Sequence, residues 1–500
     1  KLRYTMPFRP VEETFEYLRS VATPEGDRLI VFADDGEKFG VWPGTYKQCY
    51  ESGWLDSFFS LLEENLDWIH LLNFKEALAL LKPVGRVYLP TASYREMMEW
   101  ALPARAIHQY EKFAHWLEEQ DAADNKVFVR GGFWRNFFAK YPESNNLHKR
   151  MLYTVKRLKT VPASSPEAQS AQDHIYAAQC NCPYWHGVFG GLYLPHLRYA
   201  IYSNLIAADK LLDSTRSAVQ KKSGWVEVES IDFDADGNDE LVIQTDKMNL
   251  FLCPAYGGAL FELDYKPKNL NIIDTMARRE EGYHRKLTEA QNQQSDGQVA
   301  SIHDIILSKE EGLENYLHYD WHRRLSLLDH FLHPQTDIES LKKVRYGEQG
   351  DFINQPFQFK IVTKQDKVQI KLERNGHVWI GSWFAPVLLQ KTVEVSRASD
   401  KVTLKYMITN PNDQGIALWF APEFVYSLLA GNAKDRYYSV DGKKLEPPHL
   451  ASMGMTSAIK KLAITDEWMG IRIDLCVDKE ADFWRFPIET ISMSEAGFER

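Results

Sequence analysis

The chain has 500 residues, of which 44% are hydrophobic and 26% charged, a composition typical of a folded protein and not of a disordered one. The net charge of −10 argues against a dedicated nucleic-acid or anionic-membrane partner, because both require a basic surface. No apolar run is long enough to predict a membrane span. The five cysteines are few and scattered, which indicates reduced thiols and a cytoplasmic location rather than a disulfide framework.

The beginning of the chain has the pattern of one unit of an α/β fold. Residues 10–22 carry apolar side chains on one stripe and predict an amphipathic helix. The apolar run at residues 29–33 predicts a strand buried on both faces of a parallel sheet. A parallel strand needs neighbours, and no nearby segment has the same pattern. We therefore expect the rest of this sheet to lie upstream of Lys1.

The next part of the chain, to about residue 216, has helical periodicity, with apolar residues three and four apart. We expect Pro103 to break or kink one of these helices, because proline lacks the backbone N–H that a helix interior needs. This pattern predicts a helical bundle over residues 71–217. The expected helices cover residues 54–64, 74–81, 94–119, 134–158, 166–179 and 195–214.

After residue 224 the hydrophobic period changes to two. Residues 391–395 and 402–408 alternate apolar and polar side chains and are separated by a turn, which predicts an antiparallel hairpin. Repeated short strands of this kind predict a large antiparallel β-sandwich over residues 218–500. An insertion at residues 278–332 is first polar and then helical.

Three carboxylates, Asp34, Asp35 and Glu37, follow the expected strand within four positions. Folds of the α/β class place their active sites at the carboxyl ends of parallel strands. Carboxylates this close raise one another's pKa unless a cation intervenes. An acidic solvent loop is the alternative for the carboxylates alone. Together with three glycines and the flat apolar face of Trp42, they favour a functional site.

A second segment rich in aromatic residues and glycines, residues 179–196, joins two expected helices. Its composition suits a wall that binds sugar rings, and a helix-packing loop is an equal alternative. Cys180, Cys182, His186 and His196 are potential zinc ligands. Cys-x-Cys is an unusual zinc spacing and a second cysteine pair is absent, so buried thiols are the default interpretation.

A third segment covers residues 88–103. Ser93 is expected to cap a helix there, with Glu96 three residues on completing a capping box. Trp100 is expected in the apolar core.

Asp232, Asp234 and Asp236 open a segment that begins like a calcium loop. An EF-hand is excluded because the position that needs a glutamate is Ile243. A structural calcium site held by these three carboxylates and a tight acidic β-turn remain equal alternatives. No cofactor for catalysis is expected.

Residues 34–45 closely resemble the fourth signature region of glycoside hydrolase family 57, in the branch that contains 4-α-glucanotransferases and related α-amylases. Residues 88–103 and 184–196 are similar to the same branch, and the three motifs occur in the family's order. The resemblance implies an α+β multidomain fold. The last βα unit of a (β/α)7 barrel would occupy residues 1–70, followed by the helical bundle and the β-sandwich.

The resemblance also implies a retaining enzyme that acts on α-1,4-glucans and maltooligosaccharides, by transfer to another glucan or by hydrolysis. Enzymes of this family use a glutamate nucleophile and an aspartate general acid/base, and the matching aspartate is Asp35. The substrate-binding segments of the family match Glu37, Trp42, Trp185 and His186. We expect the indoles of Trp42 and Trp185 to be exposed in one cleft and to stack on glucose rings. The nucleophile region and the His-Gln-Pro motif of the family have no counterpart in this sequence.

Two hypotheses of other classes remain: a non-catalytic carbohydrate-binding protein and a structural subunit. The substitution of Asp35 by asparagine separates them from an enzyme. Because the nucleophile region lacks a counterpart, we expect these 500 residues by themselves to show no transferase activity. The sequence is compatible with a homodimer.

Overall fold

The computed structural model describes residues 2–89, 91, 93–187, 190–216, 224–289, 310–494 and 497–500. Helices dominate the described part before residue 214, and antiparallel strands dominate from residue 226 onward. The helical and the antiparallel halves of the prediction are thereby confirmed.

Helices form at the positions that the apolar spacing predicts. The predicted helix at residues 94–119 is divided at Pro103, as expected, and the one at 134–158 is divided where Pro142 opens a new helix. None of the described helices is long and apolar enough to cross a membrane. The helices are α1 (Leu2–Thr5), α2 (Val11–Val21), α3 (Trp54–Glu64), α4 (Phe74–Leu80), α5 (Arg95–Trp100), α6 (Ala104–Glu119), α7 (Asn136–Lys140), α8 (Pro142–Leu158), α9 (Pro166–Ala177), α10 (Pro195–Asp213), α12 (His284–Glu289) and α13 (Ile338–Lys342).

The prediction of a buried parallel strand at residues 29–33 is wrong. These residues form no strand, and Leu29 and Val31 are 51% and 57% exposed. No strand among the described residues pairs with this segment. An apolar sequence becomes a buried strand only where neighbouring strands take up its backbone hydrogen bonds. The segment is therefore an extended connection that leads from α2 to the acidic loop.

The predicted capping box is also wrong. Helix α5 begins at Arg95 with Tyr94 as its N-cap, and no side chain caps it. The Ser93 hydroxyl instead accepts a hydrogen bond of 3.0 Å from the backbone N–H of Trp134. Ser93 therefore links the start of α5 to the segment that leads into α7, and it does not cap the helix N-terminus.

The strands form five antiparallel sheets in the described part of the chain. Their orders are β1-β2-β3-β4-β5, β10-β9-β8-β7, β11-β6, β13-β12-β14-β15 and β16-β17. The strands are β1 (Val226–Ile231), β2 (Glu240–Thr245), β3 (Met248–Cys253), β4 (Ala259–Tyr265), β5 (Leu270–Asn271), β6 (Leu328–Phe331), β7 (Gln358–Thr363), β8 (Lys367–Ile380), β9 (Trp383–Ser396), β10 (Val402–Thr409), β11 (Phe420–Glu423), β12 (Arg436–Val440), β13 (Lys443–His449), β14 (Gly454–Asp466), β15 (Ile471–Arg485), β16 (Ser492–Ser494) and β17 (Gly497–Glu499).

The predicted hairpin around residue 398 is confirmed, because β9 and β10 pair with Val393 opposite Leu404. The main apolar core takes side chains from two sheets at once. One cluster contains the fully buried Ile243 and Leu250 of the five-stranded sheet and Ile370 of the β10-β9-β8-β7 sheet. Burial of both inner faces against each other holds the two sheets together.

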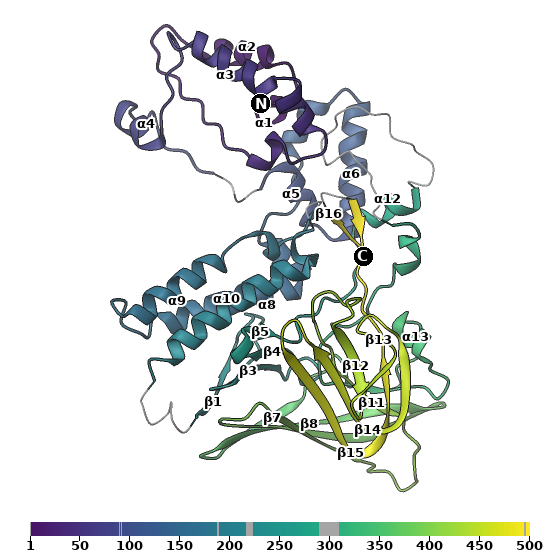
Figure 1. Cartoon of the computed structure of the whole chain (residues 1–500). Helices are drawn as coiled ribbons and strands as arrows, with labels where there is room; N and C mark the ends of the chain where they lie inside the picture. The colour runs from purple at the N-terminus through teal and green to yellow at the C-terminus, as the bar shows by residue number, and fades with distance from the viewer. Residues whose placement is uncertain are drawn as a thin grey trace.

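Figure 1 shows α1, α2 and α3 at one end of the molecule, the five-stranded and four-stranded sheets at the other end, and α8, α9 and α10 between them. A buried ion-pair network joins these middle helices to the five-stranded sheet. The guanidinium of Arg150 in α8 donates to Glu262 at 2.6 Å and to Asp264 at 3.1 Å, both in β4, and also to Asp209 in α10. A buried arginine requires such partners, so the network fixes the helices on the sheet.

Candidate active site

The acidic loop turns through a short 3-10 helix, η1 (Gly36–Phe39), with Asp35 at its N-cap. Its three carboxylates have different surroundings. The Asp34 side chain is almost completely buried, whereas Asp35 and Glu37 are exposed. The two residues that the resemblance assigns to chemistry and sugar binding are thus the two that a substrate can reach.

A buried cation compensates the remaining carboxylate of the loop. The Lys38 ammonium donates to the Asp34 carboxylate and to the backbone carbonyl of Arg3. Burial lowers the pKa of Lys38, and the adjacent Asp34 carboxylate opposes that change. Asp34 is therefore a structural anchor for the loop, and its neighbour Asp35 is left directed to solvent.

The loop then reverses direction so that Trp42 enters the protein. Gly40 has a φ of +145°, and a Cβ there would lie 2.8 Å from the ring of Tyr50, so this turn requires glycine. The Trp42 N–H donates to the carbonyl of Glu37 at 3.1 Å, which closes the turn. The indole stacks on Phe8 with ring centroids 6.3 Å apart.

The two tryptophans that were expected as open platforms, Trp42 and Trp185, are each only 7% exposed. Trp185 stacks on Trp100 with ring centroids 5.8 Å apart and an interplanar angle of 9°. A Cβ at Gly187 would lie 2.4 Å from the Trp100 ring, so glycine at this position permits the close stacking. The expected exposure of both indoles is wrong, because neighbouring aromatic rings cover their faces.

Trp100 brings the three sequence motifs together. It packs against the cluster that contains Trp42 and against the cluster that contains Trp185. It also meets the edge of Tyr94, with ring centroids 6.1 Å apart. Burial raises the pKa of Tyr94 to about 12, although the charge of Arg3 opposes this rise.

The end of the chain completes this region. The β16 residue Met493 and the β17 residue Phe498 belong to the apolar cluster around Trp42. The carbonyl of Met493 also accepts a hydrogen bond of 2.9 Å from the N–H of Gly190, in the motif that contains Trp185. The acidic loop and the C-terminal hairpin, more than 400 residues apart in sequence, therefore support one site.

His186 is buried and lies behind the stacked tryptophans. Its Nδ1 is 2.8 Å from the carbonyl of Gly190, and its Nε2 is 2.6 Å from the hydroxyl of Tyr283. A carbonyl only accepts, so Nδ1 carries the hydrogen and Nε2 accepts from the tyrosine. Burial lowers the pKa of His186 to about 4, which keeps the ring neutral near pH 7.

A buried carboxylate that sequence reasoning missed, Glu281, lies next to this histidine. It accepts hydrogen bonds of 2.8 Å from the hydroxyls of both Tyr141 and Tyr193, and it pairs with the Lys140 ammonium at 2.9 Å. Burial raises the pKa of Glu281, but Lys140 and these hydrogen bonds outweigh it and leave the pKa below its ordinary value. The partners come from separate segments, so no local motif could have revealed the network.

The cysteine motif of residues 179–196 does not form a metal centre in the part of the chain that the structure describes. Cys180 and Cys182 are free thiols, and both are exposed rather than buried as expected. Both ring nitrogens of His186 are used in hydrogen bonds to Gly190 and Tyr283, and His186 forms no metal-ligand group with the two cysteines.

The acidic segment before β2 forms a compact turn. The Asp236 N–H donates to Asp232 and Asp234 at 3.1 and 3.2 Å, while the Asp236 carboxylate accepts from Asn238. The structure groups Asp232 and Asp234 with the buried Glu240, each with one oxygen within 4.8 Å of the others. Glu240 thus takes the place that the sequence assigned to Asp236. Burial raises the pKa of Glu240 to about 7.

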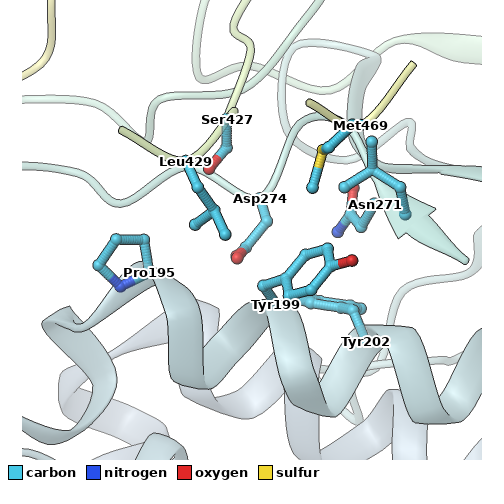
Figure 2. Close-up of a pocket in the computed structure, with 9 residues that line it drawn as sticks. Pro195, Tyr199, Tyr202, Asn271, Asp274, Ser427, Leu429 and Met469 are labelled. Atoms are coloured by element: carbon cyan, nitrogen blue, oxygen red, sulfur yellow. The ribbon is translucent and has the colours of Figure 1, made fainter. Parts of the chain in front are cut away.

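A pocket between α10 and the sheets contains none of the predicted site residues (Figure 2). Tyr199 and Tyr202 of α10 line it together with Asp274. Its interior of about 10 Å³ holds about one water molecule, which is too small for a sugar ring. This pocket is therefore not a sugar-binding site, and the acidic loop is the candidate substrate site.

Comparison with known proteins matches the same segments in the same order. The sequence profile of glycosyl hydrolase family 57 matches residues 1–90. Profiles described as the middle and the C-terminal domains of α-amylase/4-α-glucanotransferase match residues 132–212 and 232–500.

Similar proteins extend over the whole chain. It is 39% identical to α-amylase 1 of Dictyoglomus thermophilum and 38% identical to 4-α-glucanotransferase of Thermococcus litoralis, covering 100% of this chain and 69% of each relative. The crystal structure of the Thermococcus litoralis enzyme superimposes with a TM-score of 0.78 at 36% identity, covering 100% of this chain and 68% of that one. These matches define a carbohydrate-active enzyme, and the chain belongs to glycosyl hydrolase family 57.

Proposed function

We propose that Asp35 is the general acid/base of a retaining enzyme that transfers or hydrolyses α-1,4-glucosidic bonds. The observation that carries this proposal is the different surroundings of Asp34 and Asp35 in the acidic loop. Lys38 neutralises Asp34, and Asp35 remains exposed in the same loop as Trp42, which packs in one cluster with Trp100. The relatives are named α-amylase and 4-α-glucanotransferase, which supports the same bond type for this chain.

In this mechanism Asp35 protonates the glycosidic oxygen as the leaving sugar departs. A nucleophilic carboxylate about 5–5.5 Å away bonds to the anomeric carbon in the same step. Asp35 then removes the proton from the acceptor hydroxyl that attacks the glycosyl-enzyme. A glucan hydroxyl gives transfer, and water gives hydrolysis.

Asp35→Asn, made in the protein that also includes the nucleophile region, tests this role, because asparagine keeps the shape of the side chain but cannot transfer the proton. We expect the rate on maltooligosaccharides to fall by about 10²–10⁴-fold. The decrease in the rate of the first step, formation of the glycosyl-enzyme, should be much smaller with α-maltosyl fluoride, because its leaving group needs no proton. The first step is measured as the burst of fluoride release.

Asp27→Asn is the matched control, since Asp27 is exposed and lies in the segment that leads to the loop. It should keep full activity. Equal loss of activity on both substrates by Asp35→Asn would contradict proton transfer by Asp35, and unchanged activity on maltooligosaccharides would show that Asp35 takes no part in the reaction.

The predicted sugar-binding residues Glu37, Trp42, Trp185 and His186 retain their proposed roles in modified form. Glu37 is exposed and available for direct contact with a sugar hydroxyl. Trp42 and Trp185 are covered, so we propose that they shape the floor of the site through Trp100. His186 positions Trp185 from behind, through its hydrogen bonds to Gly190 and Tyr283.

The same proposal includes the domain organisation. Residues 1–70 would be the end of a (β/α)7 barrel, residues 71–217 a helical bundle and residues 218–500 a β-sandwich that buries the core shared by two sheets. A cytoplasmic location is proposed because none of the five cysteines forms a disulfide.

A structural calcium ion is proposed at Asp232, Asp234 and Glu240. Oxygen donors of this kind suit calcium, and the three side chains already lie close together. We expect calcium at 100 times its dissociation constant to stabilise the protein by about 2.7 kcal/mol. The measurement is the melting temperature with calcium and with chelator, and Asp232→Asn should abolish the difference. Asp239→Asn, outside the group, is the control.

A further inference from the structure

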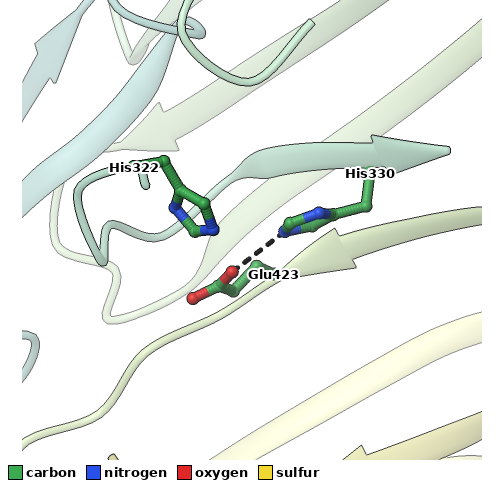
Figure 3. A group of neighbouring side chains, drawn as sticks. All are labelled: His322, His330 and Glu423. Atoms are coloured by element: carbon green, nitrogen blue, oxygen red, sulfur yellow. Dashed lines mark hydrogen bonds and ion pairs between the residues drawn. The ribbon is translucent and has the colours of Figure 1, made fainter. Parts of the chain in front are cut away.

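A second group of metal-type ligands lies far from the acidic loop, between two strands and the segment before them (Figure 3). His330 is in β6, Glu423 is in β11, and His322 is in the segment that leads into β6. Both histidines are buried, with exposures of 3% and 4%. His330 pairs with Ala421 across the two strands, so Glu423 is its diagonal neighbour on the same face.

The ligand atoms of the three residues converge. One nitrogen of each histidine and one oxygen of Glu423 all lie within 4.8 Å of one another. Around a tetrahedral zinc ion with bonds of about 2.0–2.2 Å, ligand atoms are about 3.3 Å apart. The His330 Nε2 and Glu423 Oε2 atoms are already 2.9 Å apart. Small side-chain rotations would therefore complete the geometry.

The orientation of both imidazole rings is set by their outer nitrogens. The His330 Nδ1 is 2.8 Å from the carboxylate of Glu348, and the His322 Nδ1 is 2.8 Å from the carbonyl of Arg323. Each acceptor holds a hydrogen on Nδ1 and leaves Nε2 for the centre of the group. A metal-binding histidine is supported in this way, by a carboxylate or a backbone carbonyl on its other nitrogen.

The inner nitrogen of His322 gives an independent indication of a missing partner. Its Nε2 is buried and forms no hydrogen bond with any residue that the structure describes. Figure 3 shows this ring directed toward Glu423 and His330. Leaving a buried acceptor without a partner costs about 1–3 kcal/mol, and a cation at the centre of the group would supply the partner.

We propose that His322, His330 and Glu423 form a zinc site that joins β6, β11 and the segment before them. Two imidazoles and one carboxylate suit zinc, whereas calcium and magnesium prefer oxygen ligands. The three protein ligands leave one position for water. Arg324 donates to both oxygens of Glu423, at 3.1 and 3.2 Å, so an ion bound to Oε2 would leave the guanidinium to Oε1.

The test begins with the chelator-treated full chain and titrates it with Co²⁺, then with Zn²⁺. We expect one ion per chain, a tetrahedral cobalt absorption spectrum and its loss when zinc displaces cobalt. His322→Ala should weaken zinc binding at least 100-fold. His318→Ala, in the same segment but outside the group, should leave it unchanged. Glu348→Gln, which keeps an acceptor for His330, should weaken it by about 10–100-fold.

X-ray absorption of the zinc-loaded wild-type protein keeps the proposal testable if the His322 variant does not fold. We expect two imidazole nitrogens and no sulfur around the ion. Sulfur ligands, zinc affinity that is unaffected by His322→Ala, or no zinc binding at all would overturn the proposal. The last outcome would leave His330 as a charged bridge between Glu348 and Glu423 only.

Discussion

The acidic loop, through Trp42, and the network around Glu281, through Tyr141, both adjoin the aromatic group of Trp100, but their carboxylates have opposite environments. Asp35 and Glu37 are exposed and have no fixed cationic partner in the loop, because Lys38 is bound to Asp34. Glu281 is buried and accepts hydrogen bonds from two tyrosines. A carboxylate that transfers protons must meet the substrate, whereas one that positions a wall must be saturated with protein partners.

The largest expected effect is a loss of folding stability when the buried Glu281 network is disrupted. Glu281→Ala removes the acceptor of two tyrosine hydroxyls and leaves the Lys140 ammonium without its partner. We expect a loss of about 3–5 kcal/mol in the free energy of unfolding, measured by urea denaturation. Glu280→Gln, at the exposed neighbouring position, should change it by less than about 0.5 kcal/mol. A small effect of Glu281→Ala would show that the network is dispensable.

The pH dependence of stability separates the two environments next. The folded protein holds the pKa of His186 at about 4, against an ordinary value of 6.5. The unfolded chain therefore binds this proton first, and stability falls as the pH drops from about 6.5 to about 4. The loss from this group approaches about 3 kcal/mol.

His186→Gln should flatten the stability curve across this pH window, when denaturant unfolding is measured at several pH values. His115→Gln is the control, because the His115 side chain is 71% exposed in α6. If the slope of the His186 variant equals that of the wild type, the histidine is not held neutral by burial.

The smallest expected effect concerns Glu37, an exposed carboxylate of the acidic loop. Glu37→Gln removes one charged acceptor that faces solvent, so stability should stay within about 0.5 kcal/mol. We expect the KM for maltooligosaccharides to rise by about 10-fold through a weaker hydrogen bond to the sugar, with kcat nearly unchanged. Glu25→Gln, also exposed, should alter neither. A large loss of kcat would instead assign Glu37 to the chemistry.

The sequence carried enough information for the helices and for the long antiparallel strands, because both follow from local periodicity. The pairing of Val393 with Leu404 needed only two alternating segments and a turn between them. The apolar segment at residues 29–33 failed the same logic, since the partners of a parallel strand are not local and none pairs with it in the described part.

The sequence by itself determined the family, the acidic loop and the candidate proton donor Asp35, since these reside in short continuous motifs. Only the tertiary structure decided which carboxylate is neutralised, which tryptophans are covered, and that Glu281, Glu240 and the two histidines before and within β6 acquire partners. The physical reason is distance along the chain. Glu281 meets Tyr141, 140 residues away, and Trp42 packs with Met493, and no spacing rule records such meetings.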